Sequence, residues 1–204
     1  MNNPRTEQSQ GNPPSTPLFP GLALGAVADD LKPRTSPHLR IEALEYLLNE
    51  SDYPKALSAA IPPLFAYSMD VVKTALQVMQ TIGEKMRSQG GSCPDNVRRA
   101  LLDQIELLDT TGRIPCLRRQ YYVEPLATDF RVAIGYTLTC LGVDCDAALA
   151  VYKDVVCRAL KKEIRCTKKV QGCLAALVAA PNAEELLKDI RPQLESNRTL
   201  KKLL

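Results

Sequence analysis

Residues 64–87 read LFAYSMDVVKTALQVMQTIGEKMR, and their apolar side chains recur at the spacing of a buried helix. Successive members of the seam are four, three, four, three and seven residues apart: Phe65, Met69, Val72, Leu76, Met79 and Met86. This spacing places them on one side of a helix with 3.6 residues per turn, interrupted only by Gly83. The near-heptad spacing repeats too few times to indicate a coiled coil. We therefore predict that residues 64–87 form a buried central helix.

The composition also favours helices. Of the 204 residues, 45% are apolar, but only 5% are aromatic and none is Trp. A core for this chain must therefore consist mainly of Leu, Val, Ile and Ala, and straight-chain residues and alanine lose little side-chain freedom in a helix. No apolar run approaches the roughly 18 residues that a membrane-spanning helix needs.

Helix-start and helix-stop signals divide the rest of the chain. Ser36-Pro37 is a helix N-cap followed by Pro at the first helical position, and Ser51 and Asp52 can cap a short second helix that stops before Pro62-Pro63. Pro115 breaks any helix within the irregular stretch 113–123, and Gly142 ends a helix. Pro192 is expected to kink or split the last helix. These signals predict helices over 37–50, 52–61, 94–111, 124–141, 144–164, 167–180 and from Asn182 onward.

The fold class that follows is all-α. We expect a compact bundle of about seven to eight helices, antiparallel to their neighbours because the connecting loops are short. No internal repeat at a fixed period is visible, so a helical solenoid is not demonstrated. Residues 1–36 differ in composition: they hold six prolines and many Asn, Gln, Ser and Thr, and we expect a disordered or extended tail there. The predicted division is a tail over 1–36 and a helical domain over 37–204.

The net charge of +3 is unevenly distributed, and residues 153–169 hold seven basic but only two acidic residues. If the helix continues, Arg158, Lys162, Arg165 and Lys169 form one narrow strip at about 100° per residue, with Lys161 and Lys168 beside it. Such a strip can neutralise the phosphates of nucleic acid or of anionic lipids. Two alternatives stay open: a break near Cys166-Thr167 would turn half of the strip away, and the strip could be an ordinary solvated helix face.

A second basic cluster has the composition of a nucleic-acid contact. Arg113, Arg118 and Arg119 are followed directly by Tyr121 and Tyr122. Arg binds phosphate with two parallel hydrogen bonds, and Tyr rings stack on bases. The alternative interpretation is a loop that packs onto the core through its two tyrosines.

Residues for catalysis or metal binding are scarce, and we expect no enzyme activity, no cofactor and no metal site. Catalysis by a Ser or Cys nucleophile needs a neighbouring base. The only histidine, His38, lies in a first helical turn, where a capping or surface position is expected. No two of the seven cysteines have Cys-x-x-Cys spacing, so we expect small buried apolar residues rather than zinc ligands. The odd count and the lack of a secretory signal predict reduced thiols in the cytosol or nucleus, and no secretion.

The sequence thus predicts a non-enzymatic helical assembly or adaptor protein that acts through protein contacts, either with a partner or as a homo-oligomer. Its basic face, residues 113–169, is expected to meet phosphate-bearing partners. The combination of a helical domain, a Pro-rich tail and a basic face is typical of small viral structural proteins of the matrix or nucleocapsid-associated kind, although no motif carries that analogy. The alternative function is a regulatory protein that binds RNA or an anionic membrane.

Overall fold

The computed structural model describes Leu31 and residues 35–66, 68–111, 124–143 and 145–204. Within these residues the chain is helical and contains no strand, which confirms the all-α fold. Seven α-helices have seven residues or more: α2 (Pro37–Tyr46), α3 (Tyr53–Ala59), α5 (Met69–Ser88), α6 (Asp95–Thr111), α7 (Glu124–Leu141), α8 (Cys145–Leu160) and α9 (Lys168–Val178). The shorter elements are η1 (Leu47–Asn49), α4 (Ile61–Leu64), α10 (Ala183–Leu187), α11 (Arg191–Ser196) and η2 (Leu200–Leu203).

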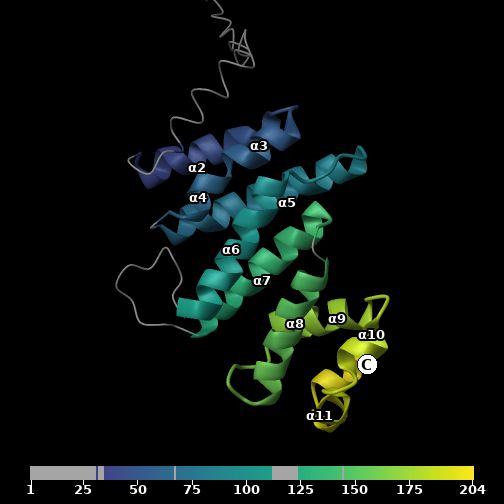
Figure 1. Cartoon of the computed structure of the whole chain (residues 1–204). Coiled ribbons are helices and arrows are strands. Elements are labelled where there is room, and N and C mark those ends of the chain that lie inside the picture. The colour runs from purple at the N-terminus through teal and green to yellow at the C-terminus, as the bar shows by residue number, and fades with distance from the viewer. Residues whose placement is uncertain (1–30, 32–34, 67, 112–123, 144) are drawn as a thin grey trace, which may run out of the picture.

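The helices follow one another through the molecule, from α2 and α3 at one end to α10 and α11 at the other (Figure 1). The long helix α5 packs on α2, α3 and α4 on one side and on α7 on the other. Helix α7 also contacts α6, α8 and α9, and the C-terminal elements α10 and η2 pack on α9. One continuous apolar core of mostly Leu, Val, Ile and Ala side chains connects these layers.

Helix α5 is the central helix predicted from the sequence, although it begins at Met69 rather than at residue 64. Val72, Leu76, Met79 and Met86 of the predicted seam are buried, together with Val71, Ala75, Val78 and Ile82. Phe65 is the error in that prediction, because it follows α4 and its side chain is 45% exposed. The helix α3 ends at Ala59, before Pro62 and Pro63 as expected. The two prolines then occupy the first turn of the separate short helix α4, where a helix needs no N–H donors, and Phe65 follows that helix instead of belonging to α5.

Other predicted signals are confirmed at atomic detail. The Ser36 hydroxyl accepts a hydrogen bond from the Leu39 backbone N–H at 3.5 Å, and the Asp52 carboxylate accepts one from the Lys55 N–H at 3.2 Å. The last helix is split before Pro192, giving α10 and α11. Leu31 falls within the segment expected to be a tail, yet it is buried in the core. Residues 1–30 and 32–34 lie outside the described residues.

Three helices end in the same hydrogen-bonded turn. After α5, α7 and α8, a residue in the left-handed conformation follows the helix: Gly90 (φ 74°), Gly142 (φ 71°) and Lys162 (φ 63°). At the end of α8, the Lys162 N–H donates to the Ala159 carbonyl at 3.1 Å and the Glu163 N–H to the Arg158 carbonyl at 2.9 Å. This is the Schellman pattern of helix C-caps. The sequence signals predict the cap at Gly142 but extend α8 to Ile164, because Lys162 gives no stop signal.

Two similar units lie near the two ends of the described helices. The segment from α2 to α4 and the segment from α9 to α11 each consist of a helix, a turn and two short helices, offset by 130 residues. Their equivalent positions hold five identical residues: Leu44 and Leu174, Leu47 and Leu177, Leu57 and Leu187, Pro62 and Pro192, Leu64 and Leu194. All of these leucines are buried in both units. With only two copies this far apart, the similarity does not produce a fixed period in the sequence.

Helices α5 and α7 approach closely at Gly83, which has no side chain to separate them. A Cβ atom added at Gly83 would lie 2.9 Å from Leu141 Cδ2 and 3.2 Å from the Cys140 carbonyl oxygen. Polar contacts lie on either side of this point: Gln80 Nε2 donates to Thr137 Oγ1 at 2.9 Å, and Arg87 Nη1 donates to the Thr139 carbonyl at 2.8 Å. The interruption seen in the sequence seam is therefore the contact point of the two helices.

Gly83→Ala is predicted to destabilise the protein, because the new methyl group would push α7 away from α5. The expected loss is about 1–2 kcal/mol of unfolding free energy, since overpacking costs more than the roughly 1 kcal/mol that alanine gains in helix propensity. Gly172→Ala in α9 is the matched control, because nothing lies within 4 Å of its added Cβ. Urea unfolding followed by circular dichroism should show this control to be stabilised, and equal stabilisation by Gly83→Ala would contradict the close contact.

Lys162→Gly is predicted to stabilise the protein by about 1 kcal/mol, because the left-handed conformation costs a non-glycine residue roughly that amount. The neighbouring Lys161→Gly change removes the same charge at a residue that has no positive φ, and it should be destabilising. Thermal and urea unfolding of both variants measure the difference. A loss of stability in Lys162→Gly would show that α8 does not end in this cap.

Candidate functional site

The residues that the sequence singled out fall into two groups. Arg113, Arg118, Arg119, Tyr121 and Tyr122 lie outside the described residues. Arg158, Lys161, Lys162, Arg165, Lys168 and Lys169 lie at the junction of α8 and α9. The continuous strip of Arg158, Lys162, Arg165 and Lys169 is not formed, because α8 ends at Leu160 and residues 161–167 form a loop before α9 begins. The alternative prediction, a break in the helix near Cys166-Thr167, is therefore right that the helix is interrupted. The interruption begins earlier than predicted, because α8 already ends at Leu160.

Two of these cations hold the junction together through ion pairs. Arg158 Nε lies 3.2 Å from Glu163 Oε2, which ties the last turn of α8 to the loop. Lys169 Nζ lies 2.5 Å from Asp129 Oδ2, which ties the first turn of α9 to α7. The Arg158 side chain is only 18% exposed, whereas that of Lys169 is 53% exposed. Arg158 and Lys169 therefore contribute to the fold, and their charges are neutralised locally.

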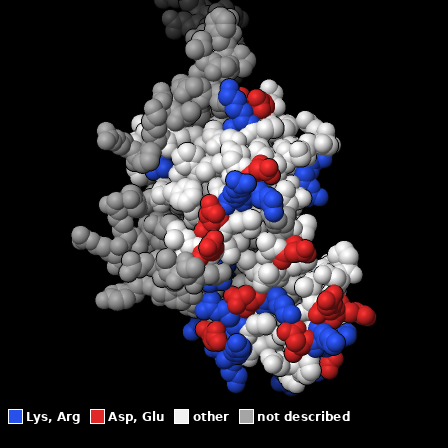
Figure 2. All heavy atoms as spheres, in the orientation of Figure 1, with Lys and Arg blue, Asp and Glu red and all other residues white. Residues whose placement is uncertain are grey.

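The other four cations form an exposed group, which we call the basic loop: Lys161, Lys162, Arg165 and Lys168. Within the part of the chain that the structure describes, none of the four forms an ion pair. The nearby acid Glu163 is bound to Arg158, so it does not offset their charge. Figure 2 shows basic and acidic side chains interspersed over much of this face, with basic ones predominating at the lower left, at the end of the molecule where α8 ends.

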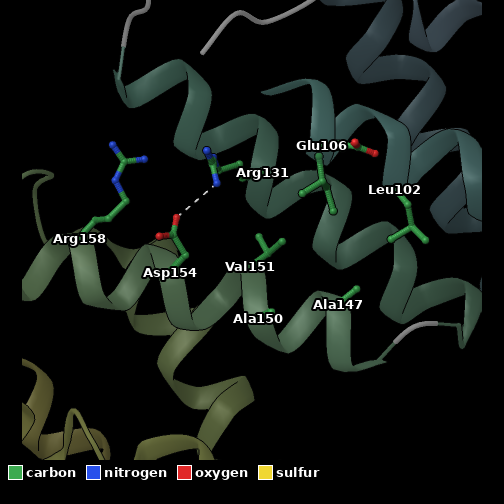
Figure 3. Close-up of a pocket in the computed structure, with 9 residues that line it drawn as sticks. Leu102, Glu106, Arg131, Ala147, Ala150, Val151, Asp154 and Arg158 are labelled. Atoms are coloured by element: carbon green, nitrogen blue, oxygen red, sulfur yellow. Dashed lines mark hydrogen bonds and ion pairs between the residues drawn. The ribbon is translucent and has the colours of Figure 1, made fainter. Parts of the chain in front are cut away.

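A groove that the sequence did not predict runs between α6, α7 and α8, with a volume of about 740 Å³. Its apolar lining comes from Leu102 and Ile105 of α6 and from Ala147, Ala150 and Val151 of α8. Its polar lining consists of Glu106, Arg131, Asp154 and Arg158. Figure 3 shows Arg158 at one end of the groove and Ala147 and Leu102 at the other, with Arg131 reaching across to Asp154. We call this feature the α6–α8 groove.

The ion pair between Arg131 and Asp154 connects two walls of the groove. Arg131 Nη1 lies 3.4 Å from Asp154 Oδ2, and the Arg131 side chain is 13% exposed. Along α8, the lining residues recur at 147, 151, 154 and 158, the spacing of one helix face. That spacing is present in the sequence. It gives no signal there, because alanines and charged residues do not make an apolar seam.

The histidine His38 and the two buried thiols, Cys140 and Cys173, are the side chains that we considered for catalysis. His38 is exposed on α2, where its Nε2 lies 3.0 Å from Glu42 Oε1. Burial raises the pKa of Cys140 to about 11, helped by its hydrogen bond to Glu84, and burial also raises the pKa of Cys173 to about 11. Both thiols stay protonated at neutral pH, whereas a thiolate is the nucleophile and the metal ligand.

The prediction that the cysteines are small buried residues is confirmed only in part. Cys140 and Cys173 are buried, but Cys145 and Cys166 are exposed because they lie at the start of α8 and in the loop before α9. Cys116 lies outside the described residues. Among the described side chains, no three His, Cys, Asp or Glu residues converge as a metal site.

None of the described helices has the length and apolar character needed to cross a membrane. Comparison of the chain with models of protein families, with curated proteins and with solved structures finds no match. A function must therefore be inferred from the α6–α8 groove and the basic loop.

Proposed function

We propose that this chain is a non-enzymatic helical adaptor or assembly protein that acts through protein contacts, and that the α6–α8 groove is its binding site. The observation that carries this proposal is the groove itself, with about 740 Å³ of space over small apolar side chains. Concave apolar surfaces with a few placed charges are typical of sites that receive a helix or peptide. Homo-oligomerisation, a cytosolic or nuclear location and a structural role in a virus remain predictions from the sequence.

The groove has the chemistry of a peptide-binding surface. The exposed Ala150 and the half-buried Ala147 leave room for the side chains of a partner, and Leu102 and Ile105 are half-buried in the unbound protein. A ligand that covered these residues would remove apolar area from water, at about 25 cal/mol per Å². Arg131 and Asp154 neutralise each other in their ion pair, so neither of these two side chains requires a charged group on the partner.

Peptides selected for binding to the wild-type protein from a displayed library of helices are predicted to occupy this groove. Ala150→Arg should weaken their binding by about 100-fold, since it places a long charged side chain where an apolar surface must be buried. Ala175→Arg is the matched control, because Ala175 is an exposed helical alanine on α9. Binding is measured by biolayer interferometry, with melting curves to show that both variants fold. Ligands that bind all three proteins equally, or no ligand at all, would contradict the proposal.

A second candidate function, binding of a phosphate-bearing polymer such as RNA, is favoured by the basic loop. Its four cations are exposed, and the neighbouring acids Glu163 and Asp129 are held by Arg158 and Lys169. A cluster of uncompensated Lys and Arg attracts phosphates by counterion release. The described residues of the loop offer no aromatic ring for base stacking, so this contact would be made to the backbone.

If the basic loop binds RNA, a labelled RNA oligonucleotide should bind more weakly when Lys161, Arg165 and Lys168 become Gln and Lys162 becomes Asn. The dependence of log K on log salt should flatten by about 0.7 for each phosphate that the variant no longer neutralises. Lys55, Lys73, Lys188 and Lys202, all exposed, provide a control of equal net charge when changed to Gln. Fluorescence anisotropy at two salt concentrations compares the proteins. No binding at low salt, or an equal decrease in the control, would remove this candidate.

A further inference from the structure

We propose that the occupant of the α6–α8 groove is an amphipathic helix of another protein that runs antiparallel to α8, with acidic residues in its first turn and basic residues in its last. This inference rests on the proposed adaptor function and adds the chemistry and direction of the partner. It follows from the length of the groove, the small residues on α8 and the distribution of charge along it.

The groove has the length of a short helix. Its lining on α8 extends from Ala147 to Arg158, which corresponds to about 16 Å at 1.5 Å per residue. Three turns of a partner helix cover that distance. Small residues such as Ala147 and Ala150 let two helix axes come close, and the larger Leu102 and Ile105 form the opposite wall. A helix with Leu or Met at every third or fourth position therefore fits this space.

The exposed charges that flank the groove differ in sign between its two ends. One end of the groove is marked by Ala147 and Leu102 (Figure 3). The exposed acids Asp146 and Asp103 are their neighbours in the sequence, Asp146 before Ala147 and Asp103 after Leu102. At the Arg158 end, α8 runs directly into Lys161 and Lys162 of the basic loop. Between these ends, Arg131 neutralises Asp154. The charges that flank the groove are therefore acidic at the start of α8 and basic after its end, and the lining between them adds Glu106 on the α6 wall.

This polarity fixes the direction of a helical partner. Isolated helices are most stable with acids in the first turn and bases in the last, because these charges offset the helix dipole. Such a helix matches the groove only when its acidic N-terminus lies at Lys161 and Lys162 and its basic C-terminus lies at Asp146. That orientation is antiparallel to α8, and the two helix dipoles then also oppose each other. A helix running parallel to α8 would place like charges together at both ends.

Two stapled peptides of about five helical turns test this inference directly. Both carry a Leu seam at positions i, i+3, i+4 and i+7. One has three Glu in its first turn and three Lys in its last turn, and the other has these charges exchanged. Circular dichroism of the free peptides checks that the staple gives both the same helicity. A difference in affinity then does not come from the effect of the helix dipole on helix formation. We expect the acid-first peptide to bind roughly tenfold more tightly, as a few exposed ion pairs provide, and this preference to fall in about 0.5 M salt.

Variants of the protein test whether Lys161 and Lys162 cause the preference for the acid-first peptide. Lys161→Gln with Lys162→Asn should reduce the tenfold preference to about twofold, and Asn tolerates the left-handed conformation at residue 162. Lys201→Gln with Lys202→Gln removes the same charge from the exposed η2 segment and should leave the preference unchanged. Ala150→Arg should abolish binding of both peptides.

Several outcomes would overturn the inference. These are a preference for the base-first peptide, equal binding of both peptides, or binding of neither. If neither binds while library-selected ligands still depend on Ala150, the groove remains a binding site and only the partner chemistry is wrong. Self-association that Ala150→Arg abolishes would make a second copy the occupant. RNA that displaces the acid-first peptide and requires Ala150 would make a nucleic acid the ligand.

Discussion

The backbones of α5 and α7 come together at Gly83, and the positions of the later helices depend on this contact. Helix α7 carries Arg131, which pairs with Asp154 of α8, and Asp129, which pairs with Lys169 of α9. Whatever places α7 against α5 therefore also places the walls of the α6–α8 groove. A side chain at residue 83 would meet the Cys140 carbonyl, so the shape of the groove depends in part on the absence of one methyl group from α5.

The charges at the α8–α9 junction have two separate roles. Arg158 and Lys169 are bound to Glu163 and Asp129, and these pairs hold the loop and α9 in place. Lys161, Lys162, Arg165 and Lys168 are exposed in the loop after α8 and at the start of α9. Because α8 ends at Leu160 in a left-handed cap at Lys162, these cations do not continue a straight helical strip. Ion-paired and exposed cations are thus neighbours in one short segment, and the proposed binding uses only the exposed ones.

The all-α class and most helix boundaries could be predicted, because periodic apolar residues and the signals at Ser36, Asp52, Gly142 and Pro192 act locally. Sequence reasoning fails where the deciding contact is distant or unusual. Lys162 adopts a conformation that normally marks glycine, so the predicted α8 runs past its true end. The α6–α8 groove could not be predicted, because it is formed by helices that meet only in the folded chain and is lined by small or ion-paired residues that carry no motif. The burial of Leu31 depends in the same way on tertiary packing.

Measuring the direction in which a helical peptide binds is the most direct test of the proposed groove. A nitroxide attached to the N-terminus of the acid-first peptide should broaden the backbone amide NMR signals of Lys161–Arg165. The same label at the peptide's C-terminus should broaden those of Asp103 and Asp146, since paramagnetic broadening falls steeply with distance. This pattern would establish both the groove and the antiparallel direction. The reverse pattern, or broadening confined to α9–α11, would contradict the proposal that a helix binds in the α6–α8 groove antiparallel to α8.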